Sequence, residues 1–403
     1  MELAIIIVIL VLLIILIYGN PNLIIGALVS VLVSVILTPN IGSIKYDKVG
    51  GRGQVEFPYK KYFISRDRIP VMLNAIKTLK YIKAPHNLQP APQKLELVRQ
   101  KDAYDGADVI GDLFTEEARM IANVDHHPSP LKFWQTREML VRLEAKKKFP
   151  DKYDENDINP TGKNAFALRE TIYAITKEAN QFSPSAASAI YKLVYQYLGH
   201  KIDIFDPFAG WGDRGIAAIA NLDTTVNSYT GIDANSNLRK GYELIGQLKS
   251  EKEEVKEKVK FHIADSLTYL KDHIEQLKGK FDLVFTSPPY YNYETYSQDN
   301  EQSIKGKSSY QDWLKTFYEP ILVLLATLVK PNGIFIIHVG PTYSAPTFDT
   351  DTKAILDKTN LKFYNTIYFN GDRIIPAFIY TNQSIIKCQK DTRMRHGGCR
   401  IFC

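Results

Sequence analysis

Cysteine is scarce in this sequence, and its placement excludes two kinds of site. The three cysteines, Cys388, Cys399 and Cys403, all fall within the last sixteen residues. Disulfides therefore cannot staple a domain core, which suits a reducing compartment. These cysteines and His396 also lack the Cys-x-x-Cys pair typical of zinc sites, so we expect no bound metal.

Charged residues are almost absent from the first forty residues, where Glu2 is the only one. Residues Leu3 to Tyr18 are all apolar or aromatic, and the run Leu23 to Leu37 is interrupted only by one glycine and two serines. Sixteen helical residues span roughly 24 Å, which approaches the thickness of a bilayer core. The pattern predicts transmembrane segments within residues 1–40, in contact with the lipid bilayer through residues 3–37.

Two arrangements of these segments are open. A turn at Gly19 to Asn22 favours a hairpin of two crossing helices, because Asn, Gly and Pro suit turns. In the alternative, only the first run crosses and the second lies in the interface. Lysines and arginines follow from Lys45 onward, so the positive-inside rule predicts a membrane location with the large domain on the cytosolic side.

Long apolar runs are absent from the rest of the chain, which excludes a polytopic membrane protein. The overall composition, 45% hydrophobic and 23% charged, also excludes collagenous and wholly disordered classes. The net charge of +6 is compatible with a polyanionic partner, although a solvated surface with a slight cationic excess explains it equally well.

Residues 41–180 form a predicted accessory region in which many prolines forbid long uninterrupted helices. Apolar spacing predicts three helices there, over Val71–Ile82, Asp112–Val124 and Pro130–Lys148. We expect this region to be mostly helical and to be available for target binding.

From residue 181 to 386 the pattern changes to alternating strands and helices. Ser183 and Pro184 predict the capped start of a helix over Ser185–Leu198. The expected strands are Ile202–Phe205, Tyr229–Ile232, Val259–Ile263, Phe281–Thr286 and Gly333–Val339, and the helices between them are Ile216–Asn221, Leu238–Leu248, Leu267–Leu277 and Trp313–Val329. This order predicts an α/β fold with a mostly parallel sheet covered on both faces, and ligands bind at the carboxyl ends of such strands.

The first strand leads into Asp206-Pro207-Phe208-Ala209-Gly210-Trp211-Gly212-Asp213-Arg214. Glycines at 210 and 212 allow a sharp turn and the close approach of a ligand. A tight structural turn is the alternative for such a short motif. The third glycine of the dinucleotide motif is missing, and the Asp206 carboxylate suits a cationic ammonium better than a pyrophosphate.

Aspartates end the next two strands. Asp233 stands where an acidic side chain can bind both hydroxyls of a ribose, and Asp265 could accept a hydrogen bond from an adenine amino group. For both residues, capping of the following helix is the alternative.

The segment Thr286-Ser287-Pro288-Pro289-Tyr290 ends the fourth strand and carries the clearest chemistry. An exocyclic amine of a nucleobase is a poor nucleophile, because its lone pair is delocalised into the ring. Acceptors such as the Ser287 hydroxyl and the Pro288 carbonyl favour a pyramidal nitrogen and stabilise the growing positive charge. Pro289 stiffens the backbone, and Tyr290 offers a ring on which an extruded base can stack.

These motifs resemble those of S-adenosylmethionine-dependent amino-methyltransferases, which methylate N4 of cytosine or N6 of adenine in DNA. The resemblance covers roughly residues 180 to 385 and implies a Rossmann-like methyltransferase sheet, S-adenosylmethionine as cofactor and a nucleic-acid partner, with DNA favoured over RNA. Serine at the first position of the catalytic loop favours cytosine over adenine. By this resemblance the catalytic residues are Ser287, Pro288, Pro289 and Tyr290, and the cofactor-binding residues are Phe182, Ser183, Ser185, Asp206, Phe208, Gly210, Gly212, Asp233 and Asp265.

Ala209–Arg214, Phe285–Tyr290 and Phe114–Arg119 are also similar to methyltransferase-like proteins of large DNA viruses, which implies a host or virion membrane as the location. Two departures from the family are notable: the region after Tyr291 is too short for a large target-recognition domain, and a membrane anchor is unusual for a DNA-modifying enzyme. Two alternatives follow, a structural membrane or virion protein with a catalytically retired fold, and an RNA or protein-amide methyltransferase. Residues 387–403 are expected to form a basic, cysteine-containing tail.

Overall fold

The computed structural model describes residues 56–78, 81–83, 95–99, 106–125, 127–248, 255–297, 302–369 and 377–382. All of them belong to one compact unit, Glu56–Cys403. The predicted boundary between an accessory region and a methyltransferase domain near residue 180 therefore falls inside this unit and stays a prediction.

The predicted localisation is corrected by the structure. Within the residues described above, no helix is both long and apolar enough to cross a lipid bilayer. On this finding we do not retain the membrane location with the large domain on the cytosolic side. The expected transmembrane hairpin and its lipid contacts at residues 3–37 lie outside the described residues, as does the tail at 387–403.

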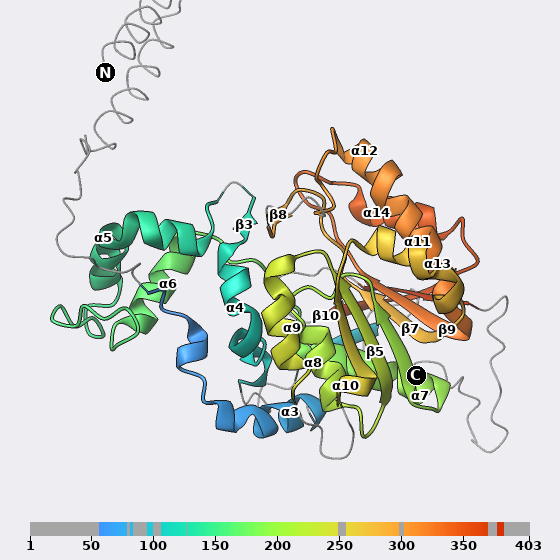
Figure 1. The fold of residues 1–403 in the computed structure, drawn as a ribbon, viewed down its shortest axis with the longest axis horizontal. Helices are drawn as coiled ribbons and strands as arrows, with labels where there is room; N and C mark the ends of the chain where they lie inside the picture. Colours follow the sequence, from blue (N-terminus) through green and yellow to red (C-terminus); the bar gives the residue numbers. More distant parts are fainter. Residues whose placement is uncertain are drawn as a thin grey trace, which may run out of the picture. The chain divides into compact units, whose positions relative to one another are not determined.

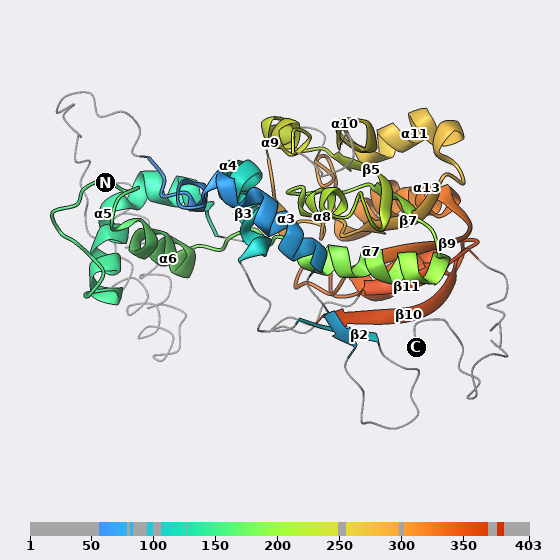
Figure 2. The same cartoon turned by 90° about the horizontal axis from the view of Figure 1, so that it is seen from below.

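A nine-stranded sheet forms the centre of the fold (Figures 1 and 2). In spatial order its strands are β1 (Tyr81–Lys83), β2 (Leu95–Arg99), β10 (Lys362–Phe369), β11 (Ala377–Thr381), β9 (Val329–His338), β7 (Phe281–Thr286), β4 (Ile202–Asp206), β5 (Val226–Asp233) and β6 (Val259–Ile263). The five strands from β9 to β6 are parallel, as predicted, whereas β11 pairs with β9 and β10 in antiparallel fashion. Both sheet faces are covered at the centre of the sheet, where all six residues of β7 are buried.

Helices cover the two faces of the sheet, with α7 and α8 on one side and α11, α13 and α14 on the other (Figure 1). The described helices are α3 (Ile69–Thr78), α4 (Asp112–Ile121), α5 (Pro130–Lys148), α6 (Ala165–Ile175), α7 (Pro184–Leu198), α8 (Asp213–Ala220), α9 (Arg239–Ile245), α10 (Val255–Lys258), α11 (Ser266–Leu277), α12 (Tyr310–Trp313), α13 (Glu319–Leu328) and α14 (Phe348–Leu356). Helix α3, from the accessory region, packs beside α7 and α8 (Figure 2). Apolar side chains of the two layers form separate cores above and below the sheet.

Several predicted elements have the expected bounds. Helix α5, strand β6 and strand β7 match the predictions residue for residue, and the Ser183 hydroxyl accepts a hydrogen bond from the Ala186 amide at 3.2 Å to cap α7. Other predictions ran too long. The helix expected over Trp313–Val329 contains a π-helical turn, η6 (Leu314–Tyr318), and Val329 already belongs to β9.

A second, two-stranded sheet joins distant parts of the chain. Strand β3 (Asn123–Val124) follows α4, and it pairs in antiparallel fashion with β8 (Glu294–Thr295), which follows the Ser-Pro-Pro-Tyr segment. The Asp125 amide also donates to the Tyr293 carbonyl at 2.6 Å. The helix predicted to run to Val124 therefore ends at Ile121, and the chain turns there to contact the predicted catalytic loop.

Candidate active site

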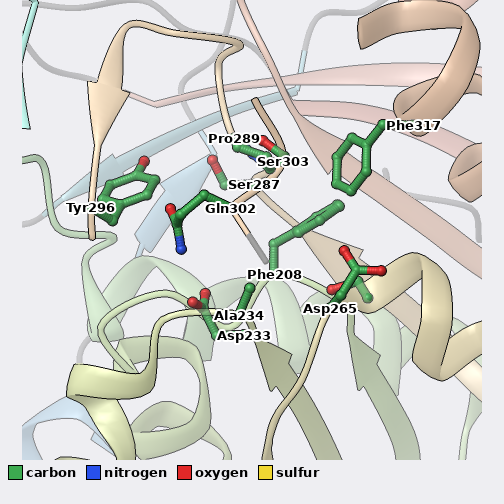
Figure 3. Close-up of a pocket in the computed structure, with 11 residues that line it drawn as sticks. Phe208, Asp233, Ala234, Asp265, Ser287, Pro289, Tyr296, Gln302, Ser303 and Phe317 are labelled. Atoms are coloured by element: carbon green, nitrogen blue, oxygen red, sulfur yellow. The ribbon is translucent and has the colours of Figure 1, made fainter. Parts of the chain in front are cut away.

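The carboxyl ends of the parallel strands border a cavity with an empty volume of about 490 Å³. Asp233, which ends β5, and Asp265, which follows β6, lie on one side, and Ser287 and Pro289, which follow β7, lie across from them (Figure 3). The remaining lining residues are Phe208, Ala234, Ser266, Tyr296, Gln302, Ser303 and Phe317. The topology thus brings together five of the predicted site residues, because parallel strands place their carboxyl ends at one edge.

Asp206 is fully buried at the end of β4, and protein groups surround its carboxylate. Arg214 donates to it through Nε at 2.7 Å and Nη2 at 3.2 Å, Tyr229 through its hydroxyl at 2.7 Å, and Thr286 through Oγ1 at 2.8 Å. Both oxygens are therefore engaged within the protein. The carboxylate that we expected to face the cofactor's ammonium instead pairs with a guanidinium eight residues further along the chain.

Gly210 and Gly212 have positive φ angles of +58° and +88°, which L-residues with a Cβ rarely adopt. A Cβ on Gly212 would also lie 2.6 Å from Cδ1 of Ile245, whereas a Cβ on Gly210 would meet only the Phe208 carbonyl oxygen, at 3.9 Å. The loop is closed by Tyr242, whose hydroxyl donates to the Gly210 carbonyl at 2.5 Å. Gly212 is thus required for packing, and Gly210 leaves room for an approaching ligand.

The Asp233 carboxylate accepts two backbone hydrogen bonds, from Gly210 at 2.9 Å and from Asn235 at 3.0 Å. Burial raises the pKa of this carboxyl to about 6, although both hydrogen bonds act in the opposite direction. No cation pairs with Asp233 among the described residues, so hydroxyl donors from a ligand would suit it. The position of Asp233 is therefore compatible with both roles considered from the sequence. It holds the turn into the next segment, and it lines the cavity.

Asp265 caps helix α11, since its Oδ1 accepts from the Thr268 amide at 2.8 Å. The alternative reading from the sequence is thus observed. The same side chain also lines the cavity, so capping orients the carboxylate toward the place where a ligand would bind.

Phe182, Ser183 and Ser185 precede the cofactor loop, but the two serine hydroxyls already have an internal partner. Both donate to Oδ2 of Asp108, at 2.8 and 2.9 Å, and the Ser185 amide donates to Oδ1 at 2.9 Å. Asp108 belongs to the accessory region, in the short helical turn η4 (Ala107–Val109). The resemblance implies that these residues bind the cofactor, and the structure places a protein carboxylate within hydrogen-bond distance of both hydroxyls.

The predicted catalytic loop contacts strand β9 through His338. Ser287 Oγ lies 3.3 Å from Nδ1 of His338, and the Tyr290 hydroxyl donates to the His338 carbonyl at 3.1 Å. The Tyr290 ring contacts Phe348 edge-on, with centroids 5.5 Å apart, and Pro288 is buried. Desolvation raises the pKa of the Tyr290 hydroxyl, so it remains protonated and can donate at neutral pH.

Sequence reasoning missed several residues that the structure brings to this site. His338 ends a strand that we had extended to Val339, and a polar residue in that position was the available signal. Arg214 stood in the quoted motif and was assigned no role. Tyr296, Gln302, Ser303 and Phe317 follow the catalytic loop without any motif, and only the tertiary fold places them on the cavity wall.

Asp213 is a further missed residue, next to the glycine loop at the start of α8. Its side chain is 2% exposed, and within the described part of the chain neither carboxylate oxygen has a hydrogen-bond partner. Desolvation, with Asp112 as the next contributor, raises its pKa to about 8. Across the described residues, no three His, Cys, Asp or Glu side chains gather in a way that could hold a metal ion.

Comparison with known families gives one match: residues 281–393 fit the model of a DNA methylase family. The matched segment begins with β7 and includes the Ser-Pro-Pro-Tyr loop and His338. It confirms the predicted enzyme class, an S-adenosylmethionine-dependent methyltransferase, and with it S-adenosylmethionine as cofactor. No curated protein matches the chain.

Solved methyltransferases are similar to part of this chain at low identity. A candidate S-adenosylmethionine-dependent methyltransferase from Streptococcus mutans is 11% identical, with 51% of this chain and 52% of that chain covered and a TM-score of 0.35. Magnesium protoporphyrin IX methyltransferase from Synechocystis, solved with S-adenosylmethionine, is 12% identical over 62% of this chain and 92% of that one, with a TM-score of 0.33. This chain thus spans about half the length of the Streptococcus protein. The resemblance to proteins of large DNA viruses has no support in these matches.

Proposed function

We propose that this protein transfers the methyl group of S-adenosylmethionine to an exocyclic amine of a nucleic-acid base, with N4 of cytosine in DNA favoured over N6 of adenine. The observation that carries the proposal is the shared cavity. Asp233 and Asp265 on one side and Ser287 and Pro289 on the other border a single space, so the groups suited to a nucleoside face those suited to an amine.

The residues present suit the cofactor's adenosine end. Asp233 is a carboxylate without a cationic partner among the described residues, and two ribose hydroxyls would supply the donors that its buried position calls for. Asp265 lies further along the same edge with one oxygen engaged in capping.

We assign Asp206 an indirect role at the methionine end. With Arg214, Tyr229 and Thr286 bound to its oxygens, it fixes the start of the glycine loop, and Arg214 in turn donates to the Phe208 carbonyl. Buried ion pairs of this kind hold a geometry well because each partner would be costly to leave alone.

The catalytic loop would orient the target amine. When bound, the cofactor supplies a sulfonium-activated methyl group, so the chain needs to position the nucleophile and stabilise the charge that develops on it. Ser287 Oγ and the Pro288 carbonyl are the acceptors on this loop, and Pro289 adds no competing amide proton.

DNA is favoured as the partner because the matching family model describes a DNA methylase. Target recognition is proposed for the accessory region, whose strand β3 pairs with β8 directly after the catalytic loop. Because the two regions are in contact at this point, target binding in the accessory region would influence the position of the catalytic loop.

Nucleoside analysis tests the proposal. The full chain is incubated with methyl-labelled S-adenosylmethionine and, in parallel, with unmethylated DNA, RNA and a protein mixture, and the digests are examined by mass spectrometry. We expect N4-methylcytosine from DNA, and we expect its yield to fall at least tenfold with Ser287→Ala, while Ser308→Ala, which removes an exposed hydroxyl, leaves it within twofold.

Three outcomes contradict the proposal in different ways. N6-methyladenine alone would move the target base, label in RNA or protein alone would move the substrate class, and cofactor binding without any transfer would favour the catalytically retired fold. Calorimetry with S-adenosylmethionine on the same preparation separates the last case from a misfolded sample.

A further inference from the structure

Ser287 and His338 form a hydrogen-bonded pair at the floor of the candidate active site. Ser287 lines the cavity, and its Oγ lies 3.3 Å from Nδ1 of His338, which stands behind it at the end of β9. His338 itself is half-buried and does not line the cavity. A group in the cavity would therefore reach the imidazole through the serine hydroxyl.

The surrounding contacts fix the imidazole in this place. Strand pairing sets the His338 backbone opposite Ala377 of β11, and the Tyr290 hydroxyl binds the His338 carbonyl at 3.1 Å. The Phe182 ring meets the imidazole edge-on, with centroids 5.3 Å apart. Three separate elements thus hold the pair, and two of them also carry predicted site residues.

We infer that His338 takes up the proton which the target amine loses on methylation, with Ser287 as the relay. This inference rests on the proposed methyl transfer to an amine. As the N–C bond forms and the C–S bond breaks, the nitrogen becomes positively charged. It returns to neutrality by giving a proton to Ser287 Oγ, while the Ser287 proton passes to His338 Nδ1, which later releases it to solvent.

The relay requires a neutral imidazole with its proton on Nε2, so that the Nδ1 lone pair accepts from the Ser287 hydroxyl. Tyr290 contacts the pair through the His338 carbonyl, and the charged groups that act on the Tyr290 hydroxyl are Glu294 and Arg214. The Arg214 guanidinium lies 5.3 Å from the centre of the Phe182 ring, which contacts the imidazole. Arg214 is itself paired with Asp206. Because His338 acts on the amine through Ser287, it is a positioning residue, and its test needs a readout that a purely structural role would not change.

The first arm of the test does not depend on methyl transfer. Nitrogen-15 NMR of the full chain with labelled histidine, assigned through His338→Asn, reports which ring nitrogen carries the proton. We expect the Nε2–H tautomer near pH 7.5 and a change in the Nδ1 shift in Ser287→Ala. A proton on Nδ1 at that pH would overturn the relay, because Ser287 would then be the acceptor.

The second arm is the pH dependence of single-turnover transfer. In the wild type, we expect the rate to fall at acidic pH, because a protonated imidazole cannot accept a further proton. Asn places Oδ1 where His carries Nδ1, so His338→Asn keeps an acceptor for Ser287 but cannot take up the proton. This variant should lose about tenfold to a hundredfold in rate and lose the acidic limb of the profile, with cofactor affinity within twofold.

The outcomes separate the relay from the proposed function. If His338→Asn retains the acidic limb, the proton goes elsewhere and the relay is wrong. Ser287→Ala combined with His338→Asn should be no slower than the slower single variant, and additive losses would also contradict a shared path. If the wild type transfers no methyl group although the Nε2–H tautomer is present, it is the proposed function that fails.

Discussion

The carboxylate of Glu294 accepts a 2.5 Å hydrogen bond from the hydroxyl of Tyr296, two residues further along the chain. Its other oxygen accepts from the amide and side chain of Asn180, at 3.2 and 3.4 Å. Asn180 in turn accepts a 2.8 Å bond from the Trp211 indole, inside the glycine loop. One acidic side chain thus connects the segment after the predicted catalytic loop to the glycine loop through Asn180, which lies between α6 and α7.

Glu294→Ala leaves the Tyr296 hydroxyl and the Asn180 amides without this acceptor. We expect the free energy of unfolding to fall by about 1–3 kcal/mol, because the substitution removes all the hydrogen bonds that this charged acceptor receives. We also expect faster hydrogen exchange in the segment 290–297. Urea unfolding and exchange mass spectrometry measure the two effects. Glu319→Ala, which removes only a surface contact of 3.9 Å with Lys358, should change stability by less than about 0.5 kcal/mol.

Asp206→Asn tests whether the buried pair with Arg214 is structural. We expect a loss of about 3–5 kcal/mol in urea unfolding, because the change leaves a buried guanidinium without its counter-charge. A residue that served only to bind the cofactor would lose affinity in calorimetry at unchanged stability. Asp154→Asn is the matched control: its partner, Lys163, is 78% exposed, so we expect a much smaller change in urea unfolding than for Asp206→Asn.

Asp233 should make cofactor affinity depend on pH. Burial raises its pKa to about 6 in the free protein, and only the ionised carboxylate offers full acceptors to ribose hydroxyls. Calorimetry should therefore show S-adenosylmethionine binding about tenfold more weakly at pH 5 than at pH 7. Asp233→Asn should bind weakly at both values, and an unchanged pH dependence in this variant would assign the effect to another group.

The stability of the free protein should change with pH in the opposite direction at this residue. A carboxyl whose folded-state pKa is raised above its ordinary value holds more protons in the folded state, so its contribution to stability falls as pH rises between the two values. Acidification from pH 7 to 5 should thus weaken cofactor binding while this carboxyl becomes less unfavourable to the fold.

Asp213 extends the same linkage to higher pH. Its pKa of about 8 means that the folded state keeps it protonated at neutral pH, whereas the unfolded chain releases the proton. We expect its contribution to stability to fall by up to about 1.4 kcal/mol per pH unit between pH 6 and 8. Asp213→Asn should flatten this part of the stability profile in urea unfolding, and an equally steep profile would show that Asp213 is not its source.

The strands and helices that could be predicted from the sequence are those that have a local pattern of apolar or capping residues. Four of the six residues of strand β7 are apolar, and both faces of the strand are covered. Helix α7 begins with a serine cap and a first-turn proline that can be recognised in the sequence. The two-residue strands β3 and β8 have no such local pattern. They form because the fold brings together the backbones of Asn123 and Thr295, which are far apart in the sequence.

The site was predictable to the extent that strand ends carry it. Asp233, Asp265, Ser287 and Pro289 reach one cavity because parallel strands align their carboxyl ends. Side-chain partners were not predictable in this way: Asp206 meets Arg214 and Ser183 meets Asp108 only once helices and turns have been packed together. The membrane location was inferred from residues 1–40, which lie outside the described residues, and no helix of the described part of the chain is long and apolar enough to cross a bilayer.

Because β3 pairs with β8, the change of sequence pattern near residue 180 does not mark a point at which the chain can be cut without loss of contacts. A fragment beginning at 181 would retain Ser-Pro-Pro-Tyr but lose the strand beside it, the Asn180 bonds to Glu294 and Trp211, and the Asp108 carboxylate between the two serines. Such a fragment would expose an unpaired backbone edge next to its own active site. The minimal enzyme is therefore larger than the segment that carries its motifs, and a shorter expression fragment should begin no later than Glu56.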